Sequence, residues 1–265
     1  MSPERVPISA CVIAMNEEDN IERCLASLDF CDETILVDSH STDRTRELAA
    51  ARGARVIERD WPGFGVQKQF AVDAARNDWV LCLDADERLS DALRSEILAL
   101  AERGMGDRDG YEMPRLSEWF GTRMRRGGWY PDRQLRLYDR RRGRWGGRPP
   151  HEHVLFEGST GRLAGDLLHV PYRSVEDHLK KIDAYTTTMA KEMYAAGRRA
   201  STLDLVFRPT LRFLRFYLFK LGLVHGWVGL LNSYLDAHYV RMKYAKLLCL
   251  QRGLPLEERP RGTRD

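Results

Sequence analysis

The sequence is poor in cysteine. Its five cysteines are an odd number, and no two of them stand in a Cys-x-x-Cys spacing. This pattern argues against a disulfide-stapled scaffold, so we expect free thiols in a reducing compartment. Residues 1–7 lack the apolar stretch of a signal peptide. The sequence therefore predicts a cytoplasmic protein.

Long apolar runs and a strong net charge are also missing. The longest uncharged stretch of the C-terminal region, residues 221–235, is shorter than the roughly 20 apolar residues that a membrane-spanning helix needs. The formal net charge of +3 is too small to predict nucleic-acid binding. With 43% hydrophobic residues in 265, the chain can form one core, or one core with an appendage.

The basic residues are unevenly distributed. Residues 115–148 hold eleven arginines and three acidic residues, a local net charge of +8. Because arginine makes bidentate contacts with phosphate, this arginine-rich segment is suited to an anionic substrate or leaving group. The alternative is a solvated basic rim, and we expect at least part of Arg140, Arg141 and Arg142 to be only surface.

The first half of the chain alternates between strand and helix patterns. Nearly continuous apolar runs predict buried strands at residues 6–14, 34–37, 55–57 and 79–83. Helices are expected after the first strand, from the capping residues 41–43 to Ala51, and over residues 64–75. This order predicts an α/β fold with a mainly parallel sheet, helices on both faces, and a ligand at the carboxyl ends of the strands.

Acidic and amide side chains follow three of these strands. They are Asn16 and Glu17, then Asp38, then Asp84 and Asp86. Two carboxylates one residue apart at the end of a buried strand repel each other unless a cation compensates them. Mg²⁺ or Mn²⁺ held by one or two carboxylates and a substrate diphosphate fits this need. The alternative is a pair of solvated acids, with Asp86 as a helix N-cap.

Three motifs in order resemble the donor half of family 2 glycosyltransferases of the GT-A fold. They are residues 14–18 (AMNEE), 36–43 (LVDSHSTD) and 79–87 (WVLCLDADE). The resemblance implies a nucleotide-sugar donor, most simply a UDP-sugar. It also implies that the first-strand loop and Asp38 contact the nucleoside, that Asp84 lies near the ribose and the metal, and that Asp86 ligates the metal.

Further segments resemble the branch that includes lipopolysaccharide-core glucosyltransferases. They are residues 61–69 (WPGFGVQKQ), 128–132 (GWYPD) and 150–152 (PHE). The branch implies inverting transfer of a hexose to a lipopolysaccharide-core or other lipid-linked glycan. By the same resemblance, Lys68 lies near the base and phosphates, Glu152 is the general base, and Asp132 is the reserve base.

Each of these assignments has a simpler alternative. Lys68 could be a solvated lysine on an amphipathic helix, and Glu152 could form a surface salt bridge with nearby arginines. The histidines beside Glu152 lack the HExxH spacing of a zinc protease, which excludes that reading.

The resemblance predicts a catalytic domain over residues 1–172. Its donor half covers about 1–110 and its acceptor half about 111–172. Residues 173–250 form a helical region that begins at a cap near Ser174, and residues 251–265 form a flexible tail. Arg208, Arg212, Arg215 and Lys220 stand among apolar residues there. This pattern predicts basic amphipathic helices in a membrane interface, or alternatively a face that packs on the catalytic domain or on a second copy.

Two other functions fit the sequence less well. A nucleotidyltransferase that makes nucleotide sugars needs a glycine-rich, basic loop after the first strand, but residues 15–19 (MNEED) are acidic and lack glycine. A non-catalytic module that binds an anionic polymer through its arginines would leave the acids at three strand ends without a purpose. We therefore expect a metal-dependent glycosyltransferase, peripheral on the inner face of the plasma membrane.

Overall fold

The computed structural model describes residues 5–147 and 152–256. The chain divides into two compact units. The first comprises residues 1–118 and 131–171, and the second comprises residues 119–130 and 172–265. Part of the predicted acceptor half, residues 119–130, thus belongs to the second unit. Pro150, His151 and most of the predicted C-terminal tail lie outside the described residues.

The first unit is built on a sheet whose first four strands are parallel. Their order is β3 (Arg55–Glu58), β2 (Glu33–Asp38), β1 (Ile8–Ala14) and β4 (Trp79–Asp84). All seven residues of β1 are buried, which explains its uninterrupted apolar sequence. The four strands expected from the sequence are confirmed, with ends that differ by a residue or two.

Beyond β4 the sheet becomes mixed. It continues with β8 (Asp132–Asp139), β6 (Gly110–Trp119), β12 (Leu167–His169) and β5 (Glu87–Leu89). Strand β8 is antiparallel to both neighbours, whereas β6 and β12 are parallel. The remaining short strands are β7 (Thr122–Arg123), β9 (Gly143–Gly146), β10 (His153–Phe156) and β11 (Thr160–Arg162). The antiparallel return of β8 brings basic side chains beside the acidic end of β4.

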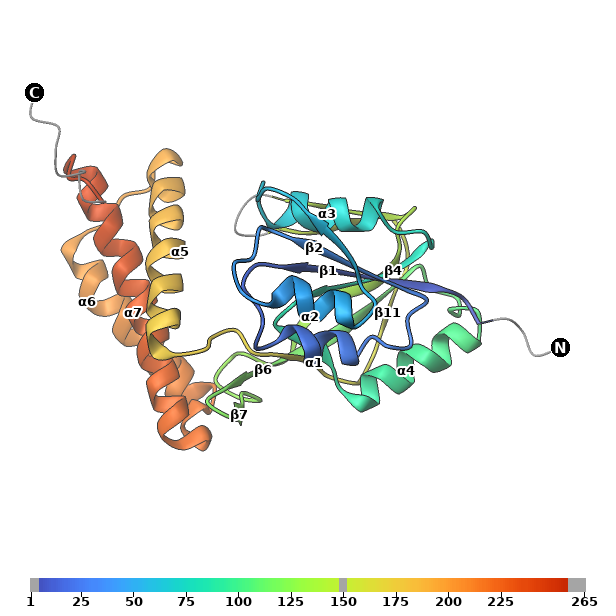
Figure 1. Cartoon of the computed structure of the whole chain (residues 1–265). Helices are drawn as coiled ribbons and strands as arrows, with labels where there is room; N and C mark the ends of the chain where they lie inside the picture. Colours follow the sequence, from blue (N-terminus) through green and yellow to red (C-terminus); the bar gives the residue numbers. More distant parts are fainter. Residues whose placement is uncertain (1–4, 148–151, 257–265) are drawn as a thin grey trace, which may run out of the picture. The chain divides into compact units, whose positions relative to one another are not determined.

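Helices cover both faces of this sheet (Figure 1). Alternate side chains of β1 point to opposite faces, so Val12 and Cys11 belong to different apolar clusters. The Val12 cluster includes side chains of α1 (Ile21–Ala26), α2 (Thr45–Ala51) and α4 (Asp91–Glu102). The Cys11 cluster includes side chains of α3 (Phe64–Asp73). The predicted arrangement of a sheet between helices is confirmed.

The second unit is helical. Its elements are α5 (Val175–Ala195), α6 (Thr202–Leu214), the π-helical turn η1 (Arg215–Phe219), the 3₁₀ turn η2 (Gly222–His225) and α7 (Gly226–Gln251). The Ser174 hydroxyl accepts a hydrogen bond from the Asp177 N–H at 3.0 Å, which confirms the predicted start of α5. Among the described helices none is by itself long and apolar enough to span a bilayer. The segments Thr202–Phe219 and Gly222–Gln251, bent by 71°, meet that criterion only together.

Candidate active site

The centre of the site is the turn between β4 and β5. Strand β4 ends at Asp84, and β5 begins at Glu87 three residues later. The Asp84 N–H donates to Glu87 Oε2 at 3.1 Å, so the turn closes on its own acidic side chain. Glu87 is buried, whereas Asp84 and Asp86 are partly exposed. The turn therefore carries one buried carboxylate and two that solvent or a ligand can reach.

Basic side chains from three elements compensate two of these acids. Lys68 Nζ, on α3, lies 2.7 Å from Asp84 Oδ1. Arg136 Nη2, on β8, lies 3.1 Å from Asp84 Oδ2 and 2.8 Å from Glu87 Oε1. Arg115 Nη1, on β6, lies 3.2 Å from the same Glu87 oxygen. We call these five residues the carboxylate cluster.

These contacts shift the ionisation of the acids. Burial alone would raise the pKa of Asp84, but the charges of Lys68 and Arg136 outweigh it and hold the pKa well below its usual range. The pKa of Glu87 is also lowered, because Arg136 and Arg115 outweigh its burial. Burial alone would lower the pKa of Arg136, but the charges of Glu87 and Asp84 outweigh it and raise that pKa. Both acids and the arginine are thus charged over the whole physiological pH range.

This arrangement adds a second source of compensation for the acids of the Asp-x-Asp motif. The sequence predicted that a bound cation compensates the acids of the Asp-x-Asp motif. In the structure, Lys68 and Arg136 compensate Asp84 directly. A metal is therefore not needed to make Asp84 tolerable at the end of the strand.

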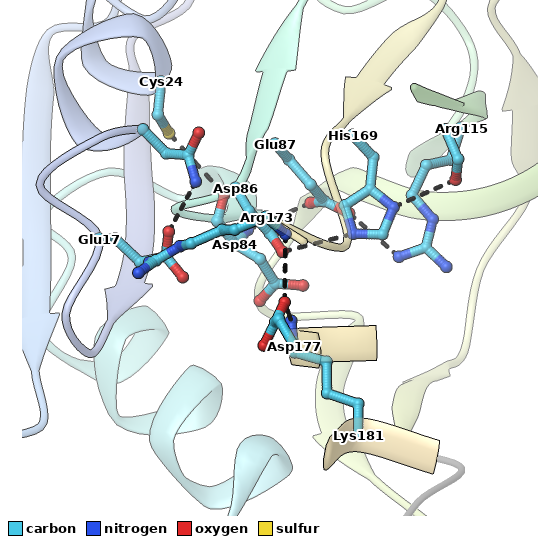
Figure 2. Close-up of polar contacts among 12 residues, drawn as sticks. Glu17, Cys24, Asp84, Asp86, Glu87, Arg115, His169, Arg173, Asp177 and Lys181 are labelled. Carbon is cyan, nitrogen blue, oxygen red and sulfur yellow. Dashed lines mark hydrogen bonds and ion pairs between the residues drawn. The ribbon is translucent and has the colours of Figure 1, made fainter. Parts of the chain in front are cut away.

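Asp86 is in a different position. Its Oδ1, like Asp84 Oδ1, is buried without a hydrogen-bond partner among the described residues, but Asp84 Oδ1 has the Lys68 ammonium 2.7 Å away. Asp86 Oδ2 lies 3.4 Å from His169 Nε2, and His169 Nδ1 lies 3.3 Å from the Ser117 hydroxyl. Figure 2 shows Asp86 and His169 joined in this way, with Glu87 and Arg115 beside them. The pairing of β12 with β5, which sets His169 opposite Glu87, brings the imidazole to this turn.

The pair of Asp86 and His169 suits a divalent ion. A partnerless carboxylate oxygen and an imidazole nitrogen are donors that metals of the Mn²⁺ type accept. A residue that hydrogen-bonds the other ring nitrogen, here Ser117, commonly orients a ligating histidine. The described residues contain no group of three or more His, Cys, Asp and Glu side chains arranged for a metal. Phosphate oxygens of a substrate would have to complete the coordination.

The two loops predicted to contact the nucleoside are joined to each other. Asn16 Oδ1 accepts a hydrogen bond from the Thr42 N–H at 2.8 Å, and the Glu17 N–H donates to the Thr45 hydroxyl at 2.7 Å. Asp38 is fully buried, and its two carboxylate oxygens accept from the N–H and the hydroxyl of Ser41. Its side chain shapes the loop, so direct contact between Asp38 and a nucleoside would need that loop to move. That contact stays a prediction.

Lys68 is not the solvated lysine of the simpler alternative. It is buried, and its ammonium lies 4.7 Å from the ring centre of Trp145 as well as beside Asp84. The ammonium is therefore held between a carboxylate and an aromatic face. A position near the phosphates of a donor stays a prediction.

The two candidate bases lie in different surroundings. Glu152 packs on Gly65 at the start of α3 and lines a cavity of about 320 Å³ together with Trp145. Asp132 is tied to the carboxylate cluster, because Arg115 Nη2 lies 2.6 Å from its Oδ2. Its other oxygen accepts from Gln134 at 2.9 Å. The salt bridge between Glu152 and an arginine, which was the simpler alternative to a catalytic role, is not found among the described residues.

Four residues of the site were not singled out from the sequence: Glu87, Arg115, Arg136 and His169. Two of them carried a signal, because Arg136 stands between Leu135 and Leu137 and His169 follows two leucines. A charged or imidazole side chain inside an apolar strand run is seldom fully buried without a partner. The partners themselves depend on strand pairing across the sheet, which the sequence pattern does not specify.

The carboxylate cluster predicts how stability depends on pH. Removing one partner of a buried ion pair leaves the other uncompensated, so Arg136→Gln should lower the free energy of unfolding by about 3–5 kcal/mol near neutral pH. Asp84 and Glu87 have lowered folded-state pKa values. The stabilisation that their ionised forms give is fully present above their ordinary pKa values of 3.8 and 4.5. It is lost as the pH falls through the lower pKa values of the folded state. On acidification, Arg136→Gln should therefore unfold at a higher pH than the unmodified protein.

Urea denaturation at several pH values, followed by circular dichroism, measures both effects. Arg142→Gln is the control, because it removes an exposed charge of the same sign and should change stability by less than about 0.5 kcal/mol. Equal behaviour of the two variants would contradict a structural role for the carboxylate cluster.

Comparison with known proteins identifies the family. The model of glycosyl transferase family 2 matches residues 9–159. The lipopolysaccharide core biosynthesis glycosyltransferase LpsC of Rhizobium meliloti is 33% identical over 92% of both chains. An uncharacterized glycosyltransferase of Rickettsia typhi is 31% identical over 91% of this chain and 86% of its own. The family match covers most of the first unit and residues 119–130 of the second, whereas the two relatives cover 91–92% of the chain.

Two solved structures are also similar. TarS 1–349 of S. aureus is 14% identical, with a TM-score of 0.46 over 94% of this chain and 92% of that one. Glucosyl-3-phosphoglycerate synthase of Mycobacterium tuberculosis, solved with Mn²⁺, UDP and glucosyl-3-phosphoglycerate, is 28% identical, with a TM-score of 0.35 over 43% and 44% of the two chains. From the family match and the relatives we conclude that this chain, with its GT-A type fold, belongs to glycosyltransferase family 2.

Proposed function

We propose that this glycosyltransferase moves a hexose, with inversion, from a UDP-sugar to a lipopolysaccharide-core or other lipid-linked glycan, and that it needs Mg²⁺ or Mn²⁺. The observation that carries the proposal is the partnerless oxygen of Asp86 beside His169, next to a carboxylate cluster that is already compensated. The similarity to LpsC supports the class of acceptor. A cytoplasmic location at the inner membrane surface is part of the proposal, since such donors and acceptors meet there.

The charges of the site support a need for a metal. Three carboxylates, those of Asp84, Glu87 and Asp132, pair with the three cations Lys68, Arg115 and Arg136, and a fourth, Asp86, lies beside the imidazole of His169. A diphosphate brings further negative charge that this balance cannot compensate. A divalent ion supplies the missing positive charge and stabilises the leaving diphosphate.

We assign different tasks to the two acids of the Asp-x-Asp motif. Asp86 and His169 would hold the ion. Asp84 keeps Lys68 and Arg136 in place, which fixes two positive charges beside the proposed diphosphate site. This modifies the expectation that Asp84 and Asp86 share the metal. A role for Asp84 near the ribose stays compatible with its partial exposure.

An inverting transfer needs a base for the acceptor hydroxyl. We propose Glu152, because its carboxylate has no ion pair among the described residues and lines a cavity. Asp132 stays the reserve candidate, since both of its oxygens accept hydrogen bonds, from Arg115 and Gln134. The ion pair between Arg115 and Asp132 would have to break before Asp132 could take a proton from the acceptor hydroxyl.

A panel of nucleotide sugars tests the donor and the metal. Release of nucleoside diphosphate should require Mn²⁺ or Mg²⁺ and stop on addition of a chelator. Asp86→Asn should reduce turnover to the level seen with chelator, because the partnerless oxygen is lost as an anionic ligand, while circular dichroism stays unchanged. Asp91→Asn is the matched control, since it removes an exposed acid at the start of α4.

Full turnover in the presence of chelator, or by Asp86→Asn, would overturn the metal assignment. Turnover limited to a donor other than UDP-sugars would overturn only the choice of nucleotide.

The base is tested by removing one carboxylate at a time. Glu152→Gln should keep donor affinity, measured by calorimetric titration with UDP and Mn²⁺, and lower kcat by roughly 100- to 10,000-fold. Asp132→Asn should alter stability through the loss of its contact with Arg115. Normal turnover by Glu152→Gln, together with a slow but donor-binding Asp132→Asn, would move the base to Asp132.

A further inference from the structure

The second unit contains a sharp break between two helices. Leu221, between η1 and η2, has a left-handed backbone with φ of 58°, which is uncommon for a residue with a side chain. After this break α7 packs closely against η2, because a Cβ on Gly229 of α7 would lie 1.9 Å from the Gly222 carbonyl oxygen. Glycine at 229 thus lets α7 start against η2. We call residues 215–227 the helical apex.

A loop from the other part of the second unit docks on this apex. The Gly127 N–H donates to the Lys220 carbonyl at 2.8 Å, and the Arg126 N–H donates to His225 Nε2 at 3.1 Å. A Cβ on Gly128 would meet the ring of Phe216 at 2.6 Å. Segments that are about ninety residues apart in the sequence therefore form one surface.

Large apolar side chains are exposed on this surface. Phe219 is 81% exposed, Trp227 65% and Val224 58%. Leu223 is exposed as well, and the ring of Phe120 lies 5.8 Å from the ring of Trp227. A soluble protein rarely exposes so many large apolar groups together without a binding partner. The apex therefore needs an apolar partner.

The charged residues of the docked loop and of the helical apex are all basic. Arg123, Arg125, Arg126 and Lys220 are exposed on the docked loop and the apex. The sequence has neither Asp nor Glu in residues 119–130 and 205–235. A symmetric contact with a second copy would set this basic rim against itself, which is repulsive. An anionic surface with an apolar interior matches both features.

We propose that the helical apex and the docked loop insert into the surface of a bilayer that contains anionic lipid. Phe219, Val224 and Trp227 enter the boundary of the acyl chains, and Arg126 and Lys220 contact lipid phosphates. This rests on the proposed use of a lipid-linked acceptor and names the part of the chain that holds the enzyme at the membrane. The bent pair of segments meets the span criterion only together, which fits a shallow re-entrant contact.

The proposal changes one assignment made from the sequence. Arg125 and Arg126 belong to the arginine-rich segment that was expected to serve an anionic substrate or leaving group. The structure places them in the second unit, on a loop bonded to the helical apex. In this proposal the phosphate partner of Arg126 is a lipid headgroup.

Flotation of the full-length chain with vesicles tests the proposal without donor or acceptor, so its outcome is separate from that of the activity assays. The chain should bind vesicles of equal phosphatidylcholine and phosphatidylglycerol more tightly than phosphatidylcholine alone. Phe219→Ser with Trp227→Ser should lower binding about tenfold or more. The matched control, Leu203→Ser with Phe207→Ser, removes exposed apolar side chains from the first turns of α6 and should bind normally.

The charge contribution has its own variants. Arg126→Gln with Lys220→Gln should remove the preference for phosphatidylglycerol, whereas Arg142→Gln with Arg144→Gln in the first unit should keep it. If the double variant of Phe219 and Trp227 and that of Leu203 and Phe207 lost vesicle binding equally, insertion of the apex would be overturned. The result would instead indicate that α6 lies flat on the membrane surface. No binding to either vesicle, or a dimer that the apex variants dissociate in sedimentation, would overturn the membrane proposal.

Discussion

The site depends on the ion pairs between the acids of the β4–β5 turn and the basic side chains of α3, β6 and β8. Glu87 is buried with Arg136 and Arg115 against the same oxygen, and Asp84 lies between Lys68 and Arg136. A carboxylate is costly to bury, so each acid requires its partners, and the partners require the strands that carry them. The acidic turn therefore depends on β8, which runs antiparallel beside β4 and carries Arg136, and on β6, which carries Arg115.

Asp84 Oδ1 and Asp86 Oδ1 are both buried without a hydrogen-bond partner among the described residues, but Asp84 Oδ1 lies 2.7 Å from the Lys68 ammonium. The buried oxygen of Asp86 is therefore the one in this turn without an ion pair among the described residues. His169 reaches Asp86 because β12 pairs with β5 at the same turn. In the proposed function, structural and ligand-binding roles are divided among residues that are close in the sequence. The proposed metal and diphosphate would meet a turn whose geometry is already set by the protein's own cations.

Much of this could be predicted from the sequence. Apolar runs and the order of strands and helices can be recognised locally in the sequence. They therefore predict the parallel half of the sheet and the edge where Asp84 and Asp86 lie. The partners of the acids could not be predicted. Arg136 is one of eleven arginines in its segment, and only the pairing of β8 with β4 selects it. The docking of residues 119–130 in the second unit likewise depends on contacts distant in sequence.

The central claim is that Asp86, and not Asp84, is the acid left free to bind a metal together with a diphosphate. Titration of Mn²⁺ followed by electron paramagnetic resonance, with and without UDP, measures this directly. The structure predicts weak binding to the free protein, since Asp86 and His169 supply too few ligands, and much tighter binding with UDP that Asp86→Asn abolishes. Binding that is indifferent to UDP, or unchanged in Asp86→Asn, would contradict the account.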